Sequence, residues 1–226
     1  VGTDLTADLL GGGVVSPTRR SKHDAVRSAV DTTTRGDVGA VTSAGRLVRF
    51  SPVDLPSVPG NSVQLAAGTR ADHYLAMAKD EHVIALVPLV ESPVLALGTA
   101  QGTVKRVAAT EIAQRDEAEI IALKPGDRVV GAAPAPDGAD LVFVSADAQL
   151  LRFDASSVRP QGRSAGGMAG VRLAGDDTVV FFGVVTDPSS ALVVTVAGSA
   201  TAIEGTDAGS GKVSAYAEFP PKGRAT

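Results

Sequence analysis

The sequence predicts an all-β protein made of repeated units, and three observations carry that prediction. Pairs of apolar strands joined by a tight turn recur along the 226 residues. Gly or Asp occupies most of these turns, where a hairpin needs unusual backbone angles. The hydrophobic fraction is 44% but aromatic residues make up only 4% and Trp is absent, so the core must consist mainly of Val, Leu, Ile and Ala.

Four segments carry the repeated strand pair, namely residues 37–50, 93–107, 140–153 and 192–203. Their second strands begin at Gly45, Gly102, Ala148 and Gly198, with spacings of 57, 46 and 50 residues. Polar and apolar side chains alternate in residues 46–50, which is typical of a half-buried strand. The uneven spacing predicts loops of different length on a common structural unit.

Two more strand candidates follow each pair, for example residues 119–123 and 128–132, so each unit is expected to hold four strands. We expect one domain over residues 1–226, with units at 37–91, 92–139, 140–191 and 192–226 and a partial unit at 1–36. Four-stranded units that bury one face against the next unit favour radial or spiral packing of blades. Periodicity leaves open whether consecutive units exchange a strand.

The charge of the chain is segregated. The formal net charge is −4, which disfavours a strongly basic nucleic-acid binder. Residues 17–35 nevertheless hold five basic residues against two acids, and residues 150–172 hold four against one. Acids gather instead at Asp116, Glu117 and Glu119. This distribution predicts a positive stripe on an acidic body, able to contact phosphates in a salt-sensitive way.

Several classes of protein are disfavoured. The absence of Cys excludes disulfides, thiolate metal sites and Cys nucleophiles. The three His residues are too scattered to predict a metal site, and no nucleophile-elbow pattern is present, so we expect no catalytic residue and no metal. No stretch approaches the roughly 20 apolar residues of a membrane span, and no secretory signal precedes the repeats. We expect a cytoplasmic protein with no membrane contact.

Two elements give the repeats a family resemblance. One is the Gly-x-x-x-Arg pattern of the second strands, as in residues 45–49 and 102–106. The other is Val158-Arg-Pro-Gln-Gly-Arg-Ser-Ala-Gly-Gly-Met-Ala-Gly-Val-Arg-Leu173, echoed by Phe219-Pro-Pro-Lys-Gly-Arg-Ala-Thr226. Together they resemble the C-terminal domain of type IIA topoisomerase A subunits, the DNA gyrase and topoisomerase IV family, over residues 37–226.

The resemblance implies a β-pinwheel, a propeller-like disc of about five four-stranded antiparallel blades. It implies a non-catalytic domain that binds and bends double-stranded DNA, within an enzyme whose ATP and Mg are used elsewhere. The implied partners are the ATPase B subunit together with the rest of the A subunit, and the isolated domain is expected to be monomeric and nucleoid-associated. Strand cleavage belongs to a tyrosine of a preceding domain in this family, so neither Tyr74 nor Tyr216 receives that role.

One departure favours the topoisomerase IV branch. Gyrases carry a Gln-Arg-Arg-Gly-Gly-Lys-Gly box, which is absent from this sequence. The segment most like it, Gln161–Gly167, matches the ordinary Gly-Arg motif instead. We therefore expect modest bending of DNA and not tight wrapping.

The candidate contacts are the basic residues on the strands and turns, because duplex DNA presents closely spaced phosphates. They are Arg46, Arg49, Lys105, Arg106, Arg152, Arg159, Arg163, Lys222 and Arg224. Alternate strand residues point to opposite faces, so only one of Lys105 and Arg106 is expected to reach a phosphate. Two other classes remain open: a propeller that serves as a protein–protein interaction scaffold, and a catalytic propeller.

Overall fold

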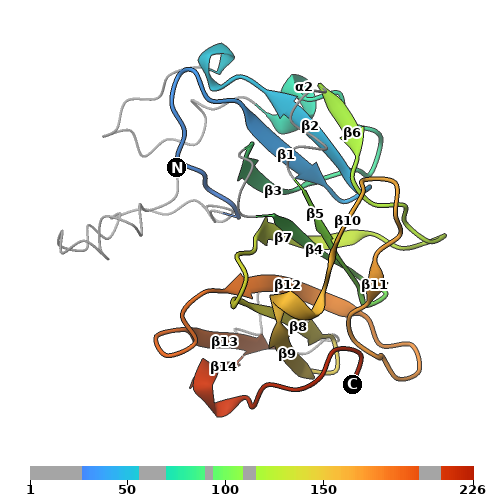
Figure 1. The fold of residues 1–226 in the computed structure, drawn as a ribbon, viewed down its shortest axis with the longest axis vertical. Coiled ribbons are helices and arrows are strands. Elements are labelled where there is room, and N and C mark those ends of the chain that lie inside the picture. Colours follow the sequence, from blue (N-terminus) through green and yellow to red (C-terminus); the bar gives the residue numbers. More distant parts are fainter. Residues whose placement is uncertain (1–26, 56–69, 90–93, 109–115, 199–209) are drawn as a thin grey trace.

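The computed structural model describes residues 27–55, 70–89, 94–108, 116–198 and 210–226 (Figure 1). The strands are β1 (Val38–Thr42), β2 (Arg46–Phe50), β3 (Val83–Pro88), β4 (Leu95–Thr99), β5 (Thr103–Val107), β6 (Glu117–Glu119), β7 (Val129–Pro134), β8 (Asp140–Ser145), β9 (Leu150–Asp154), β10 (Pro160–Gln161), β11 (Met168–Ala169), β12 (Val179–Val185), β13 (Leu192–Ala197) and β14 (Ser210–Ala215). Short helical turns join them: α2 (Ala71–Tyr74) and the 3-10 turns η1 (Pro52–Asp54), η4 (Ala155–Ser157) and η5 (Tyr216–Glu218). The all-β prediction is confirmed.

The strands form successive sheets, stacked from top to bottom in Figure 1. Blade 1 has the order β3-β1-β2-β6, and blade 2 has the order β10-β5-β4-β7 with β11 also paired to β5. Blade 3 has the order β12-β8-β9, and β13 pairs with β14 in a two-stranded sheet. The partial unit 1–36 lies mostly outside the described residues, so the number of blades stays a prediction.

The outer strand of each blade comes from the unit that follows it in the chain. β6 comes after the β4–β5 hairpin of blade 2 but pairs with β2 of blade 1. In the same way β10 and β11 come after the β8–β9 hairpin of blade 3 but pair with β5 of blade 2. For blade 3, the Lys222 amide donates to the Arg152 carbonyl at 3.0 Å. Consecutive units therefore exchange a strand, which periodicity could not decide.

Glycine shapes two of the hairpin turns. Gly45 and Gly102 have φ of 74° and 80°, the left-handed region that favours glycine. Their carbonyls also receive the exchanged strand: the Ile120 amide donates to Gly45 O at 2.9 Å, and the Gly170 amide to Gly102 O at 2.8 Å. A Cβ on Gly102 would stand 2.7 Å from the carbonyl oxygen of Val171, so there is no room for a side chain. The two glycines thus allow both the hairpin turn and the close contact with the strand exchanged from the next unit.

The core lies between the blades. Aliphatic side chains fill the space between blades 1 and 2: Val41, Leu47, Ala85, Val87, Leu95, Leu97, Val107, Ile120, Ile121 and Val129. Between blades 2 and 3, the ring of Phe182 lies against Gly98 and its backbone carbonyl lies against Gly131, the partner of Gly98 in the sheet. The Phe182 ring also contacts Phe143 edge to face, with centroids 4.9 Å apart. Of the two core clusters, the one between blades 2 and 3 is the one that contains phenylalanines, namely Phe143, Phe153 and Phe182.

The second strand of blade 2 departs from the expected alternation. All five residues of β5 are buried, including Lys105 and Arg106. The exchanged segment with β10 and β11 covers the edge of β5 while neighbouring blades cover its faces. The half-buried pattern therefore does not hold at the strand where two of the candidate contacts lie.

Candidate nucleic-acid interface

An arginine recurs at the same position of the second strand in the first three hairpins, at Arg49, Arg106 and Arg152. Arg49 Nε donates to Asp37 Oδ2 at 2.6 Å, and Arg152 Nη1 donates to Asp140 Oδ2 at 3.1 Å. Both acids lie 12 residues earlier, Asp37 immediately before β1 and Asp140 as the first residue of β8. In these two hairpins, the recurring arginine thus forms an ion pair that joins the second strand to the start of the first.

Blade 2 has Val94 in place of that acid, and Arg106 finds other partners. Its guanidinium donates to the carbonyls of Ala135, Ala155 and Val158 and to Asp137 Oδ1 at 2.7 Å. The residue is 4% exposed. Arg106 therefore joins the loop after β7 to the segment after β9.

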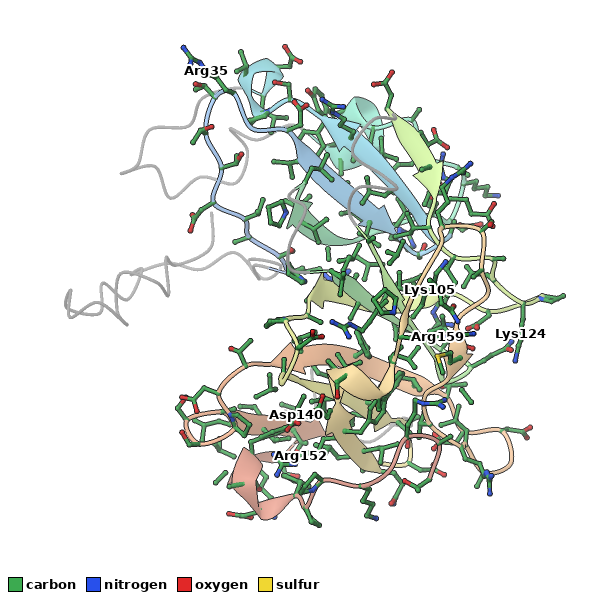
Figure 2. All side chains as sticks on the ribbon, in the orientation of Figure 1. Arg35, Lys105, Lys124, Asp140, Arg152 and Arg159 are labelled. Carbon is green, nitrogen blue, oxygen red and sulfur yellow. The ribbon has the colours of Figure 1, made fainter. Side chains whose placement is uncertain are left out.

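Lys105 is completely buried, with a relative exposure of 0%. Its ammonium donates three hydrogen bonds to backbone carbonyls, to Ile120 at 2.8 Å and to Arg163 and Ala165 at 2.7 Å each. Buried cations are tolerated where such acceptors replace water. Lys105 thus holds the exchanged loop 162–167 against blade 2. Figure 2 shows Lys105 in the same part of the view as Arg159, which precedes this loop in the chain.

These placements correct part of the predicted contact set. Lys105, Arg106 and Arg152 are 0%, 4% and 9% exposed, so these three predicted contacts are buried within the fold and not available to DNA. The expectation that one of Lys105 and Arg106 faces outward fails because both faces of β5 are covered. The physical reason is the strand exchange, which adds a covering layer where a two-faced strand was expected.

Arg46 is engaged in blade 1 by two carboxylates. Its Nε donates to Glu81 Oε1 at 2.9 Å, and its Nη1 pairs with Glu117. The hydrogen bond to Arg46, supported by bonds from Thr42 and the Ala78 amide, lowers the pKa of Glu81 to about 2. The Glu81 hydrogen bond in turn raises the pKa of Arg46 above its ordinary value. Arg46 and Arg49 therefore offer little positive charge to an outside ligand.

The remaining candidates lie on the two exchanged outer segments. Arg159 is exposed next to β10 on blade 2, and Arg163 is half-buried in the loop that follows. On blade 3, Lys222 is exposed and Arg224 is half-buried. None of these four has a carboxylate partner in the described part of the chain. They remain predicted contacts.

The two outer segments touch one another. The Ala225 amide donates to Gly170 O at 2.8 Å, and the Arg224 guanidinium donates to Ala169 O. Residues 155–173 and 219–226 contain no Asp or Glu. We call the exposed and half-exposed cations of these segments the basic band: Arg159, Arg163, Arg172, Lys222 and Arg224.

Arg172 is the member of this band that the predicted contact set left out. It is exposed, lies just beyond β11, and belongs to the motif 158–173 but not to its Gly-Arg dipeptide or to a hairpin. The absence of acids from residues 155–173 is the signal that could have found it. A band of accessible guanidinium and ammonium groups can pair with phosphate oxygens without reading bases.

The described residues offer little for other chemistry. Within the described ranges, no group of three or more His, Asp or Glu side chains could hold a metal ion. No helix in that part of the chain is long and apolar enough to cross a membrane. Tyr216 is buried, with its hydroxyl 3.1 Å from Asp140 Oδ2.

Comparison with known proteins matches the repeats to one family. The family described as "DNA gyrase C-terminal domain, beta-propeller" matches residues 94–136 and 139–186. The DNA gyrase A subunit of Salmonella typhimurium is 31% identical over 229 residues, covering 99% of this chain and 24% of that protein. Its Mycobacterium tuberculosis counterpart is 31% identical over 190 residues, covering 81% and 21%. The chain thus spans about a quarter of the length of these relatives.

Solved structures share the fold. The crystal structure of the C-terminal domain of DNA topoisomerase IV superposes with a TM-score of 0.70 at 23% identity, covering 85% of this chain and 57% of that one. The structure of the DNA gyrase A C-terminal domain gives 0.56 at 18% identity, covering 73% and 53%. These two likenesses concern the fold alone, while the relatives above carry the sequence relationship. On the evidence of these sequence matches, the chain belongs to the family of C-terminal β-propeller domains of DNA gyrase A subunits.

Proposed function

We propose that this domain binds duplex DNA along the basic band and bends it, presenting a DNA segment for strand passage by a type II topoisomerase. The observation that carries the proposal is the contact between two acid-free outer segments on adjacent blades, which together carry five cations without carboxylate partners among the described residues. Cations on adjacent blades can contact successive phosphates of a bent backbone without reading its bases.

The proposal assigns the chemistry of cleavage to the rest of an A subunit. The domain itself takes no cofactor in this proposal, and ATP and Mg act elsewhere in an enzyme completed by an ATPase B subunit in the bacterial cytoplasm. Modest bending, as in a topoisomerase IV-like domain, follows from the missing gyrase box and the net charge of −4. An acidic body with one basic band holds DNA weakly compared with a uniformly basic disc.

The test is an electrophoretic shift assay with a linear duplex at about 50 mM salt. Retention should weaken as salt rises, with a slope of log K against log salt no steeper than about −4.5, because each neutralised phosphate contributes about −0.9 and the band holds five cations. The double variant Arg159→Ala/Lys222→Ala should weaken binding and flatten this slope by about 2. DNA that migrates unshifted with the wild-type chain would overturn the proposal.

A matched control separates the band from the overall charge. Arg35→Ala/Lys79→Ala removes two exposed cations that lie outside the band, and Figure 2 shows Arg35 far from Arg159. This control should leave the slope nearly unchanged. Equal loss in both double variants would mean that binding is diffuse. A protein-interaction scaffold, the alternative that a propeller allows, predicts no retention of duplex at low salt.

A further inference from the structure

The outer strands of the blades differ in charge. Register places β6 on β2 with Glu119 opposite Arg46, and β11 on β5 with Ala169 opposite Thr103. Arg46 and Thr103 each follow the turn glycine of their hairpin, so Glu119 and Ala169 occupy equivalent positions. Two residues earlier on each outer strand, Glu117 of blade 1 is therefore equivalent to Gly167 of blade 2.

Blade 1 does not offset these acids with its own cation. Arg46 is shared between the carboxylates of Glu81 and Glu117, so one positive charge faces two negative ones. Glu119 is exposed and has no ion-pair partner in the described residues, and the exposed Asp116 adds another carboxylate immediately before β6. The outer edge of blade 1 is therefore negative, although the hairpin behind it carries two arginines.

Two neighbouring outer edges thus have opposite signs. Residues 155–173 lie on blade 2 with three arginines and no acid, while residues 116–119 lie on blade 1 with three acids and no base. Exposed charges act over a Debye length of about 10 Å at 0.1 M salt, so a phosphate backbone that continued from blade 2 onto β6 would meet repulsion. Like charges brought together at an interface select against that arrangement.

We infer that β6 ends the DNA path: the duplex contacts the outer segments of blades 2 and 3 and is turned away at Glu117 and Glu119. This inference rests on the proposed DNA binding and adds where the contact stops. Because the outer strand of a blade is donated by the following unit, the sequence after each hairpin sets the charge of the preceding blade. A short acidic strand can therefore limit the bound length without altering the blade beneath it.

Glu119→Lys tests the inference, because the side chain is exposed and its loss breaks no ion pair of the described residues. At about 50 mM salt the variant should bind a long duplex threefold to tenfold more tightly, and its salt slope should steepen by about 0.9 as one more phosphate is neutralised. Hydroxyl-radical footprints should lengthen at one end. Asp31→Lys is the matched control, because it makes the same change in net charge on the exposed segment that precedes β1. This segment lies next to β3, where the Leu86 amide donates a hydrogen bond to Ser28 Oγ.

The outcomes are distinct. A longer footprint and steeper slope in Glu119→Lys alone would support β6 as the boundary. Equal tightening in Asp31→Lys and Glu119→Lys, with unchanged footprints, would overturn the inference while leaving DNA binding intact. A wild-type chain that retains no duplex would instead remove the proposed function on which the inference rests.

Discussion

The ammonium of Lys105 lies 2.7 Å from the backbone carbonyl oxygen of Arg163, a residue of the exchanged loop on the outer edge of blade 2. The basic residue of the strand is thus inside the blade, and it holds in place the loop that contains the half-buried Arg163. Position on the strand and accessibility to DNA are therefore separate properties in this domain. The relationship leads directly to a mutational prediction.

Lys105→Met should destabilise the domain by about 2–4 kcal/mol, because it leaves the carbonyls of Ile120, Arg163 and Ala165 buried without their donor. Urea unfolding measures this change. DNA affinity should also fall, since the loop that carries Arg163 loses its anchor. Lys222→Met is the matched control: it removes an exposed cation, so stability should stay within about 0.5 kcal/mol while DNA affinity falls. Unaltered stability in Lys105→Met would refute the structural role of this lysine.

The architecture was largely predictable from the sequence because local signals determine it. Turn glycines at Gly45 and Gly102, alternating strands and the recurring hairpin indicated the repeated blade, and the Gly-Arg motif indicated the family. The exchange of outer strands was not predictable, since a strand such as β6 has the same local pattern whichever sheet it joins. Its partner is selected by the tertiary packing of consecutive blades.

The candidate site was predicted only in part, for a related reason. Arg159, Arg163, Lys222 and Arg224 lie on the outer segments and stay predicted contacts, whereas Arg49 and Arg152 of the hairpins pair with acids of their own blades. One signal was present in the sequence: Arg49 and Arg152 each follow an Asp by 12 residues. Arg106 lacks that acid and bonds to Asp137 and distant carbonyls, which no local pattern indicates.

The third hairpin turn holds a non-glycine residue in a conformation that favours glycine. Ala148 has φ of 59°, where the equivalent residues of the first two hairpins are Gly45 and Gly102. A left-handed conformation costs an L-residue about 1–2 kcal/mol, and the added flexibility of glycine in the unfolded chain offsets part of the gain. Ala148→Gly should therefore stabilise the domain by about 0.5–1 kcal/mol in urea unfolding.

Gly102→Ala provides the reverse comparison at the equivalent turn. It places a methyl group in the left-handed region and 2.7 Å from the Val171 carbonyl oxygen, so it should destabilise the domain by more than about 1 kcal/mol. A loss of stability in Ala148→Gly would mean that the third turn tolerates its alanine without strain.

The Arg46–Glu81 pair predicts sensitivity to acid. The folded state lowers the pKa of Glu81 from 4.5 to about 2, so the carboxylate stabilises the fold fully above pH 4.5. That contribution, up to about 3 kcal/mol, is lost as pH falls from 4.5 towards 2, because the unfolded chain binds the proton first. Unfolding free energies measured across this window should decline in the wild type and decline less in Glu81→Gln. An identical decline in both would assign the acid sensitivity to other carboxylates.

Tyr216 predicts how the C-terminal outer segment is held. Its ring centroid lies 4.5 Å from the guanidinium carbon of Arg152, and its hydroxyl is 3.1 Å from Asp140 Oδ2. Tyr216 therefore joins η5 to the Arg152–Asp140 ion pair of blade 3. Tyr216→Phe should cost about 1–2 kcal/mol through the lost hydrogen bond to a carboxylate.

The same substitution should speed hydrogen exchange of the Lys222 amide, because the segment that carries the amide begins at this contact and bonds to Arg152 O. Tyr74→Phe is the matched control, since its hydroxyl bonds to Ser51 O, at 3.2 Å, in blade 1. That variant should leave exchange at Lys222 unchanged. Unaltered exchange in Tyr216→Phe would show that backbone pairing to β9 and β11 holds the outer segment without help from the hydroxyl. Faster exchange would show that the ion pair inside blade 3 helps to position Lys222 and Arg224 in the basic band.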